Sequence, residues 1–264
     1  MIVRSARSAD AAARSGNPRG GRPRTTRMPT LDPAHVRPGP ARTRPSREVP
    51  LAPTLRFSLL PQDREWDLHG VVLLLHGGAA VSHEPVRPGN LAAWRMTRFA
   101  PAFRTRHRGE NPQLAVALLR NRMRGWNAED ELPVPDPVAD ALWALEQIDQ
   151  RLGPVPVVLA GHSLGGRAAL RVAGHPSVRG VAALAPWLPP GEPLAQLAGR
   201  DVLIAHGTSD RVTSLDASLG YAREAAVVAR SVQTRRFPGG HAMLRRAGRW
   251  HRLVYRFALD SLGG

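Results

Sequence analysis

The chain has 264 residues, contains neither Cys nor Lys, and carries a formal net charge of +16 at pH 7. The lack of Cys excludes disulfides, thiolate metal sites and a Cys nucleophile. No apolar run reaches the roughly 18 residues of a transmembrane helix, and the N-terminus has no apolar core typical of a secretory signal. We therefore expect a cytoplasmic protein that does not bind a membrane.

The composition changes near residue 50. Residues 1–50 contain 11 Arg and 8 Pro, only 3 acidic residues, and no helical or strand-like hydrophobic period. Such a segment buries too little apolar surface to offset its ordering entropy, so we predict a disordered tail over 1–50 and one folded domain over 51–264. A basic tail is able to bind nucleic acid. Abundant Arg, Ala, Gly and Pro without Lys are typical of GC-rich coding, however, and we expect no nucleic-acid partner.

Apolar patterns predict three strands and a helix in the first half of the domain. Alternation over 55–59 indicates an edge strand, and the continuous apolar run 70–75 indicates a central strand buried on both faces. A third strand is predicted over 114–119. Asn90 is placed to cap a helix that continues through Phe99.

The second half of the domain alternates between helices and strands. This order predicts an α/β fold with a doubly wound, mostly parallel sheet, helices on both faces and a site at the carboxyl ends of the strands. The predicted elements are a loop over 127–137, helices over 138–152, 166–173, 215–230 and 249–262, and strands over 155–160, 180–185 and 232–237 and from 201 onward.

A sharp turn is indicated by the segment GHSLG, residues 161–165, which lies between a predicted strand and a predicted helix. Such a turn needs small residues on both sides, and Gly161 and Gly165 supply them. The serine between them exposes its hydroxyl above the sheet edge, where the first N–H groups of the helix are able to bind an oxyanion. We therefore predict Ser163 as a nucleophile.

A serine hydroxyl needs a base, and the base needs a carboxylate to orient it. His241 lies after the last predicted strand, in a loop that two preceding glycines make flexible. Asp210 follows the strand that begins at residue 201. We predict His241 as the base and Asp210 as the acid. Glu192 and Asp216 are the alternative acids.

The segments LLLHGG, GHSLGG, HGTSDRVTS and PGGHAM resemble those of the α/β-hydrolase superfamily, particularly its small lidless dienelactone-hydrolase-like and carboxylesterase-like members. The resemblance covers about residues 50–262, includes the chain order Ser, Asp, His, and implies the α/β-hydrolase fold. Dienelactone hydrolases proper use Cys at the turn, so their substrate is not implied. Family members with a cap insert it after the strand at 180–185. Because only 15 residues, 186–200, follow that strand, we expect no large cap domain.

An oxyanion site is expected from the backbone N–H groups of Leu164 and Gly78. The glycine loop at residues 76–78 does not indicate phosphate binding, because the P-loop pattern and its Lys are absent. His and acidic residues do not show the spacing of metal ligands, so neither a metal nor a cofactor is expected.

The pocket is predicted from side chains that flank the site in the sequence. Arg122 and Arg124 have two open interpretations. They pair with the acidic residues 129–131, or one of them faces the site and favours a carboxylate-bearing substrate. The pocket candidates are Trp126, Trp187 and Arg124.

Together these features predict a metal-independent serine hydrolase that cleaves a small carboxylic ester. An acyl-Ser163 intermediate would form, with His241 as acid and base in both halves of the reaction. Two alternatives remain open: a small peptidase or amidase of the same fold, and a non-catalytic binding protein that has kept the fold. The oligomeric state is not indicated by the sequence.

Overall fold

The computed structural model describes residues 52–59, 68–106, 113–128 and 134–263. The predicted tail over 1–50 and the acidic run 129–131 lie outside these residues. Within them, no helix is both long enough and apolar enough to cross a membrane.

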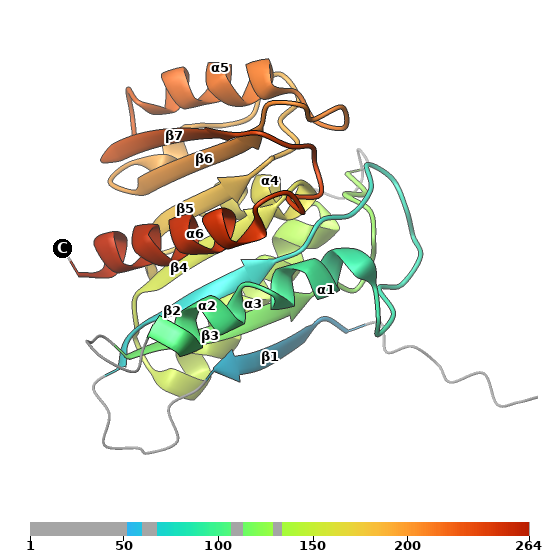
Figure 1. Cartoon of the computed structure of the whole chain (residues 1–264). Coiled ribbons are helices and arrows are strands. Elements are labelled where there is room, and N and C mark those ends of the chain that lie inside the picture. Colours follow the sequence, from blue (N-terminus) through green and yellow to red (C-terminus); the bar gives the residue numbers. More distant parts are fainter. Residues whose placement is uncertain (1–51, 60–67, 107–112, 129–133, 264) are drawn as a thin grey trace, which may run out of the picture. The chain divides into compact units, whose positions relative to one another are not determined.

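Seven strands form one sheet: β1 (Thr54–Leu59), β2 (Leu68–Leu75), β3 (Gln113–Arg120), β4 (Val157–His162), β5 (Val178–Leu184), β6 (Asp201–Gly207) and β7 (Ser231–Phe237). Their order is β1-β3-β2-β4-β5-β6-β7 (Figure 1). β1 pairs antiparallel with β3, and every other neighbouring pair is parallel. The continuous apolar runs fit this parallel pairing, because every residue of β4 and β6 is buried and parallel strands are covered on both faces. The predicted doubly wound sheet is confirmed.

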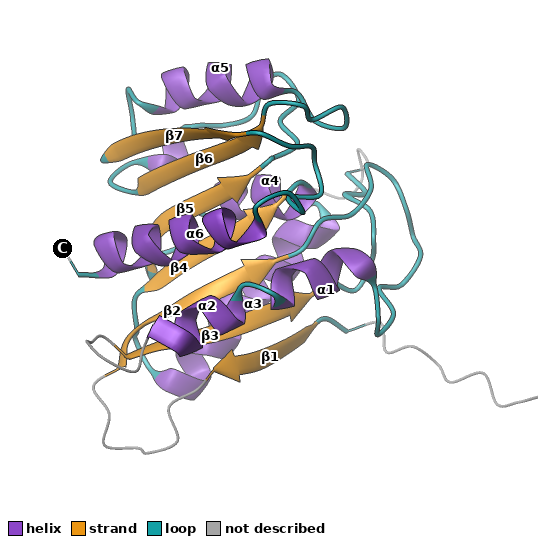
Figure 2. Ribbon diagram, in the orientation of Figure 1, coloured by secondary structure: helices purple, strands orange, loops and turns teal. Residues whose placement is uncertain are grey.

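Helices cover both faces of the sheet, as Figure 2 shows. They are α1 (Leu91–Thr97), α2 (Ala100–Arg106), α3 (Asp136–Leu152), α4 (Leu164–Arg171), α5 (Leu215–Ala225) and α6 (Ala247–Leu262). α3, α4 and α5 pack in one hydrophobic cluster with the sheet, and α1, α2 and α6 pack in a second cluster on the opposite face. Because these helices lie on the two faces, the carboxyl ends of the parallel strands form the edge where such folds place a site.

Several predicted boundaries differ from the structure by two or more residues. The largest difference is at the helix predicted over 215–230, which ends at Ala225. The helix expected to continue through Phe99 ends at Thr97, and a new helix starts at Ala100. Pro101 explains the break, because it has no N–H group to donate to the carbonyl of Thr97. α3 begins at Asp136, inside the predicted loop, since Pro137 fits the first turn of a helix, where no N–H donor is needed.

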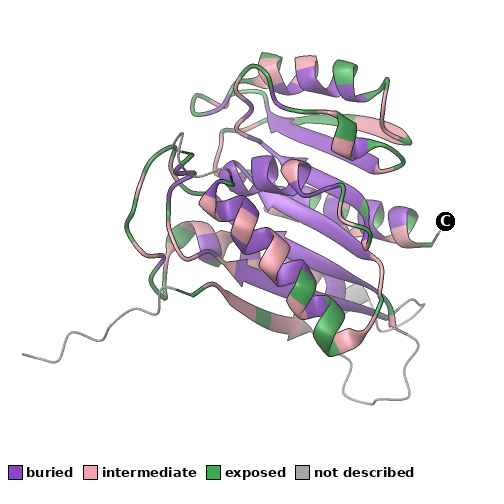
Figure 3. Cartoon of the chain, turned by 180° about the vertical axis from the view of Figure 1, so that it is seen from behind, coloured by how far each residue is buried: buried purple, intermediate pink, exposed green. Residues whose placement is uncertain are grey.

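The connection between β5 and β6 carries no cap. All of residues 185–200 are described, and their one helical segment is the 3₁₀ turn Ala195–Leu197. The expectation of no large cap domain is thus confirmed. Figure 3 shows buried residues concentrated on the sheet and on the helix faces turned toward it.

Candidate active site

The turn between β4 and α4 holds Ser163 in a backbone conformation that non-glycine residues rarely adopt. Its φ is 55° and its ψ is −117°. Four backbone hydrogen bonds maintain this conformation, one of them donated by the Trp187 N–H to the Ser163 carbonyl at 3.2 Å. The Ser163 N–H donates to the carbonyl of Leu184 at 2.9 Å, and the Ser163 carbonyl accepts from the N–H groups of Gly166 at 3.0 Å and Arg167 at 3.1 Å. The strain is therefore held by the surrounding fold, as at many functional sites.

The predicted need for glycine on both sides of Ser163 is confirmed. A Cβ atom at Gly161 would lie 2.1 Å from the carbonyl oxygen of Gly165. A Cβ atom at Gly165 would lie 2.5 Å from the carbonyl oxygens of Leu75 and His76. Strand, turn and helix therefore approach so closely that neither position has room for a side chain.

The loops after β6 and β7 interlock and bring Asp210 beside His241. The N–H of Thr208 donates to the carbonyl of Phe237 at 2.8 Å, and the N–H of Ser209 donates to that of Gly239 at 2.9 Å. Gly239 has a φ of 140°, which a glycine adopts freely. Two positions 31 residues apart in the chain thus become neighbours.

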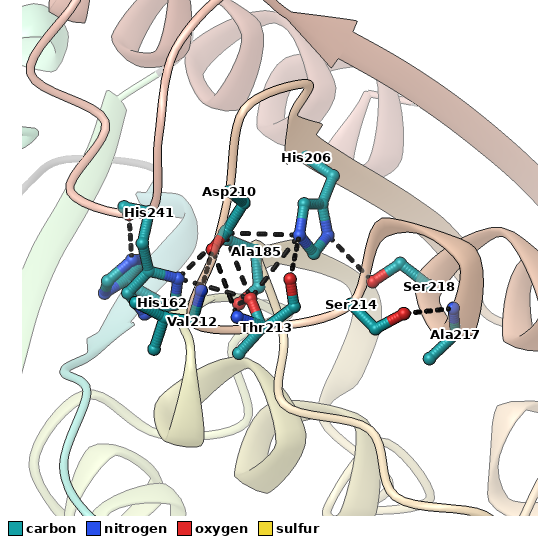
Figure 4. Close-up of polar contacts among 10 residues, drawn as sticks. All are labelled: His162, Ala185, His206, Asp210, Val212, Thr213, Ser214, Ala217, Ser218 and His241. Atoms are coloured by element: carbon teal, nitrogen blue, oxygen red, sulfur yellow. Dashed lines mark hydrogen bonds and ion pairs between the residues drawn. The ribbon is translucent and has the colours of Figure 1, made fainter. Parts of the chain in front are cut away.

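The Asp210 carboxylate is fully buried and accepts a hydrogen bond from His241, as Figure 4 shows. His241 Nδ1 lies 2.9 Å from Asp210 Oδ2, and the aspartate side chain is 0% exposed. Its second oxygen, Oδ1, accepts from the N–H groups of Val212 at 2.8 Å and Thr213 at 3.1 Å. Burial raises the pKa of Asp210, but these N–H groups and His241 outweigh it, so the pKa lies below its usual value. An ionised Asp210 is suited to hold the Nδ1–H tautomer of His241.

Two further residues, Thr213 and His206, contact the same carboxylate oxygen. Thr213 Oγ1 lies 3.1 Å from Asp210 Oδ2 and 3.2 Å from His241 Nδ1. His206 Nε2 lies 3.2 Å from Asp210 Oδ2, and its Nδ1 lies 2.9 Å from the hydroxyl of Ser218. Burial lowers the pKa of His206, although the charge of Asp210 acts against this. The sequence analysis missed both residues; the four-residue spacing of His206 and Asp210 is the signal that could have found His206.

His162 is a second histidine that the sequence analysis missed. Its ring centroid lies 4.7 Å from that of His241, and its Nε2–H donates to the His241 carbonyl at 2.8 Å. The opposite ring nitrogen, Nδ1, is buried and has no partner among the described residues. Burial, with a further contribution from the charge of His241, lowers the pKa of His162 to about 3. His162 is therefore neutral, and its ring packs against the ring of His241.

This burial predicts an acid-sensitive fold. Below pH 6.5 the unfolded chain protonates His162 but the folded chain does not until about pH 3, so stability falls as the pH drops through this window. The free energy of unfolding attributable to His162 should fall by up to about 1.4 kcal/mol per pH unit. Urea denaturation of the wild type and of His162→Phe between pH 7 and pH 4 measures the difference. Equal pH slopes for the two proteins would contradict the assignment.

A cavity of about 420 Å³ lies over Ser163. Ser163 and His241 line it together with His162, which places the predicted nucleophile and base at one site. The other lining residues are Gly77, Gly78, Asn90, Leu91, Ala92, Arg95, Arg124 and Val212.

The loop at Gly77 and Gly78 lies directly against Ser163. A Cβ atom on Gly77 would lie 3.3 Å from Cβ of Ser163, and one on Gly78 would lie 2.1 Å from the carbonyl oxygen of Arg124. Within the described part of the chain, the N–H groups of Gly78 and Leu164 donate to no other residue. Both predicted oxyanion donors are therefore unoccupied beside the serine.

Of the three pocket candidates, the structure places only Arg124 among the residues that line the cavity. Trp126 is 3% exposed, and its ring lies edge-on to Trp187 with centroids 6.2 Å apart. The guanidinium of Arg167 lies 3.8 Å from the Trp126 centroid and 4.5 Å from that of Trp187. This arrangement differs from the expected pocket role, because both rings cover a buried cation instead.

The arginines and the alternative acids have other partners. Arg122 bonds Asp140, and its guanidinium lies 3.3 Å from Asp136, whereas Arg124 pairs with Glu84. The partners expected for these arginines, residues 129–131, lie outside the described residues. The two alternative acids are also accounted for: Glu192 pairs with Arg167 and Arg171, and Asp216 is exposed in the first turn of α5.

Across the residues that the structure describes, no group of three His, Cys, Asp or Glu side chains is arranged to hold a metal ion.

Most of the folded chain matches one protein family. The model of the Alpha/beta hydrolase family matches residues 72–262. Among curated protein sequences, none matches this chain.

Solved structures with similar folds include small hydrolases. An α/β serine hydrolase without a lid from Xanthomonas campestris aligns with a TM-score of 0.53 and 17% identity over 77% of this chain and 87% of that protein. Est1E from Butyrivibrio proteoclasticus, with ferulic acid bound, aligns with a TM-score of 0.57 and 13% identity over 80% and 96%. An esterase from Pyrococcus furiosus aligns with a TM-score of 0.55 and 12% identity over 74% and 84%. At these identities the likeness shows the fold alone.

Proposed function

The chain belongs to the alpha/beta hydrolase family, and from this premise we propose that it is a serine hydrolase that cleaves small carboxylic esters. The observation that carries the proposal is the 2.9 Å contact between Asp210 and His241 Nδ1 at the cavity that Ser163 lines. Because Nδ1–H donates to the carboxylate, Nε2 keeps its lone pair and is able to accept a proton.

The proposed reaction has two halves. Ser163 Oγ attacks the ester carbonyl carbon while His241 Nε2 takes the hydroxyl proton, and the N–H groups of Gly78 and Leu164 bind the oxygen that gains negative charge. The carbon–oxygen bond to the alcohol then breaks, and His241 returns the proton to the leaving oxygen. In the second half, His241 activates a water that attacks the acyl-serine, which releases the acid and restores Ser163. Asp210 stays ionised and stabilises the charged His241 in both halves.

Two structural neighbours support an ester substrate. One is an esterase, and another holds ferulic acid, a carboxylic acid of the kind that ester cleavage releases. The alternatives are a peptidase or amidase and a non-catalytic binding protein. The strained Ser163 and the buried, ionised Asp210 argue against a protein that has lost its chemistry, because neither feature is needed for binding alone.

Labelling with a fluorophosphonate probe tests the proposal. We expect stoichiometric labelling that maps to Ser163 by peptide mass spectrometry and is lost when the protein is first denatured. Turnover of 4-nitrophenyl esters should exceed that of the matched 4-nitroanilides. Faster anilide turnover would support a peptidase or amidase, and neither labelling nor turnover would support a binding protein.

A short acyl chain should be preferred. The cavity measures about 420 Å³ and the β5–β6 connection forms no cap, so a long chain finds little apolar wall. Each buried CH₂ contributes about 0.8 kcal/mol, but only where it makes such contact. In a series of 4-nitrophenyl esters, kcat/KM should peak between roughly C2 and C6 and then level off or fall. A maximum beyond about C10, or a rate increase at the micelle threshold of the substrate, would contradict this expectation.

A further inference from the structure

An arginine that the sequence analysis did not select lines the cavity over Ser163. Arg95 lies on α1 and is partly buried, and it shares this cavity with His162 and His241. Burial lowers its pKa, and the positive charge of Arg95 in turn contributes to the low pKa of His162. The guanidinium therefore acts electrostatically on the centre of the site.

Arg95 differs from the neighbouring arginines because it has no counter-ion in the described part of the chain. Arg124 pairs with Glu84, Arg122 with Asp136 and Asp140, and Arg167 and Arg171 share Glu192. Arg95 forms no ion pair or side-chain hydrogen bond with any described residue. A partly buried guanidinium without a partner is costly, and this cost is offset when an anion binds.

The charge of the cavity lining also favours an anionic ligand. Two arginines and two histidines line it, and no Asp or Glu is among the lining residues. The charge of Arg124 is already neutralised by Glu84, so Arg95 is the cation available to a ligand. One planar guanidinium matches one carboxylate, which it binds through two parallel hydrogen bonds.

The backbone around Arg95 is fixed before any ligand binds. The side chain of Asn90 caps α1 and accepts hydrogen bonds from the N–H groups of Ala92 at 3.0 Å and Ala93 at 3.1 Å. Ala93 and Met96, on either side of Arg95, are buried in the core. Leu91 and Ala92 line the cavity beside it and offer apolar contact to a short linker.

We propose that Arg95 binds a carboxylate of the substrate, so that the preferred substrate is a short ester that carries a free carboxylate in its acyl or alcohol part. This inference rests on the proposed function for the ester bond, while the carboxylate contact itself depends only on the cavity and Arg95.

Matched pairs of esters test the preference. Mono-4-nitrophenyl adipate is compared with its neutral methyl ester for an acyl-side carboxylate, and 4-acetoxybenzoate with its methyl ester for an alcohol-side carboxylate, after subtraction of spontaneous hydrolysis. In at least one pair, kcat/KM should favour the anion, and Arg95→Gln should reduce this preference by about 10- to 100-fold. Arg95→Lys should retain part of it. Equal preference in the wild type and in Arg95→Gln would overturn the proposal.

Arg98→Gln is the matched control. Arg98 is exposed, lies three residues further along the chain and has its guanidinium 5.3 Å from the Trp94 ring. Arg98→Gln therefore removes the same charge as Arg95→Gln, but outside the cavity. The anion preference of this variant should equal that of the wild type. An equal loss in both variants would show a general effect of net charge and would also overturn the proposal.

A binding measurement separates this inference from the proposed function. Calorimetric titration of Ser163→Ala with adipate, and with neutral adipamide as the matched ligand, needs no turnover. Adipate should bind and adipamide should not, and Arg95→Gln in the same background should weaken adipate binding by at least about 10-fold. If this holds but no ester is cleaved, the proposed function fails and the carboxylate site stands. If esters are cleaved without anion preference and adipate does not bind, the carboxylate site fails and the function stands.

Discussion

Replacing Ser163 by Ala should abolish ester hydrolysis, with a loss of roughly 10⁴-fold or more in kcat. In the proposed reaction the hydroxyl oxygen forms the bond to the acyl carbon, and Ala has no group that could replace it. The fold should persist, because Ala meets the same backbone strain as Ser at a φ of 55° and the four backbone hydrogen bonds of this residue remain. Steady-state kinetics with a short 4-nitrophenyl ester and a thermal melt measure the two effects.

Ser209→Ala is the control for this variant. Ser209 lies in the interlocked loop directly before Asp210. It is exposed and does not line the cavity. Turnover and fluorophosphonate labelling should persist in Ser209→Ala and vanish in Ser163→Ala. Labelling of another serine in the Ser163→Ala protein would show that the nucleophile has been misassigned.

Asp210→Asn and His241→Ala should each reduce kcat by roughly 10³- to 10⁴-fold. Asp210→Asn removes the negative charge that stabilises protonated His241 and permits the wrong tautomer of the ring. The double variant should be little worse than either single variant, because the two residues act as one unit with Ser163. Kinetics of the wild type, both single variants and the double variant complete the cycle.

Asp216→Asn provides the matched control for the acid. Asp216 is exposed in the first turn of α5 and does not contact His241. The Asp216→Asn variant should therefore hydrolyse esters at the rate of the wild type. Additive losses in the Asp210 and His241 cycle, or wild-type turnover in Asp210→Asn, would show that the buried contact of 2.9 Å does not serve the reaction.

The thermal melt of Asp210→Asn adds an independent measurement. Asp210 accepts hydrogen bonds from the N–H groups of Val212 and Thr213. It also contacts His206 and His241. Its replacement therefore affects both the reaction and the order of the loop after β6. A comparison with His241→Ala, which leaves the loop hydrogen bonds in place, separates the loss of catalysis from the loss of stability.

Local sequence determined the sheet, the turn at Ser163 and the positions of Asp210 and His241. Continuous apolar runs predicted the buried parallel strands because such strands lose water from both faces. Gly161 and Gly165 predicted the sharp turn because only glycine fits backbones that approach so closely. Asp210 and His241 could be selected because each follows a predicted strand, and the carboxyl ends of parallel strands meet at one edge.

Only the tertiary structure decided which side chains surround these residues. His162, His206 and Thr213 join the site through contacts whose geometry depends on how two loops interlock. The contacts of His241 with His162 and Thr213 join positions far apart in the chain, and no periodicity in the sequence indicates them. For the same reason, local elements were predictable from residue patterns, whereas their mutual contacts were not.

The arginines show this division most clearly. The motif at Arg122 and Arg124 drew attention in the sequence, yet both have carboxylate partners in the folded chain. Arg95 carries no motif, but it lines the cavity and has no such partner among the described residues. Sequence determines that a charge exists, but the packing of the chain decides whether another residue neutralises it or a ligand must. The fold and the candidate reactive residues could therefore be predicted from the sequence, whereas the electrostatics of the pocket follow from tertiary structure.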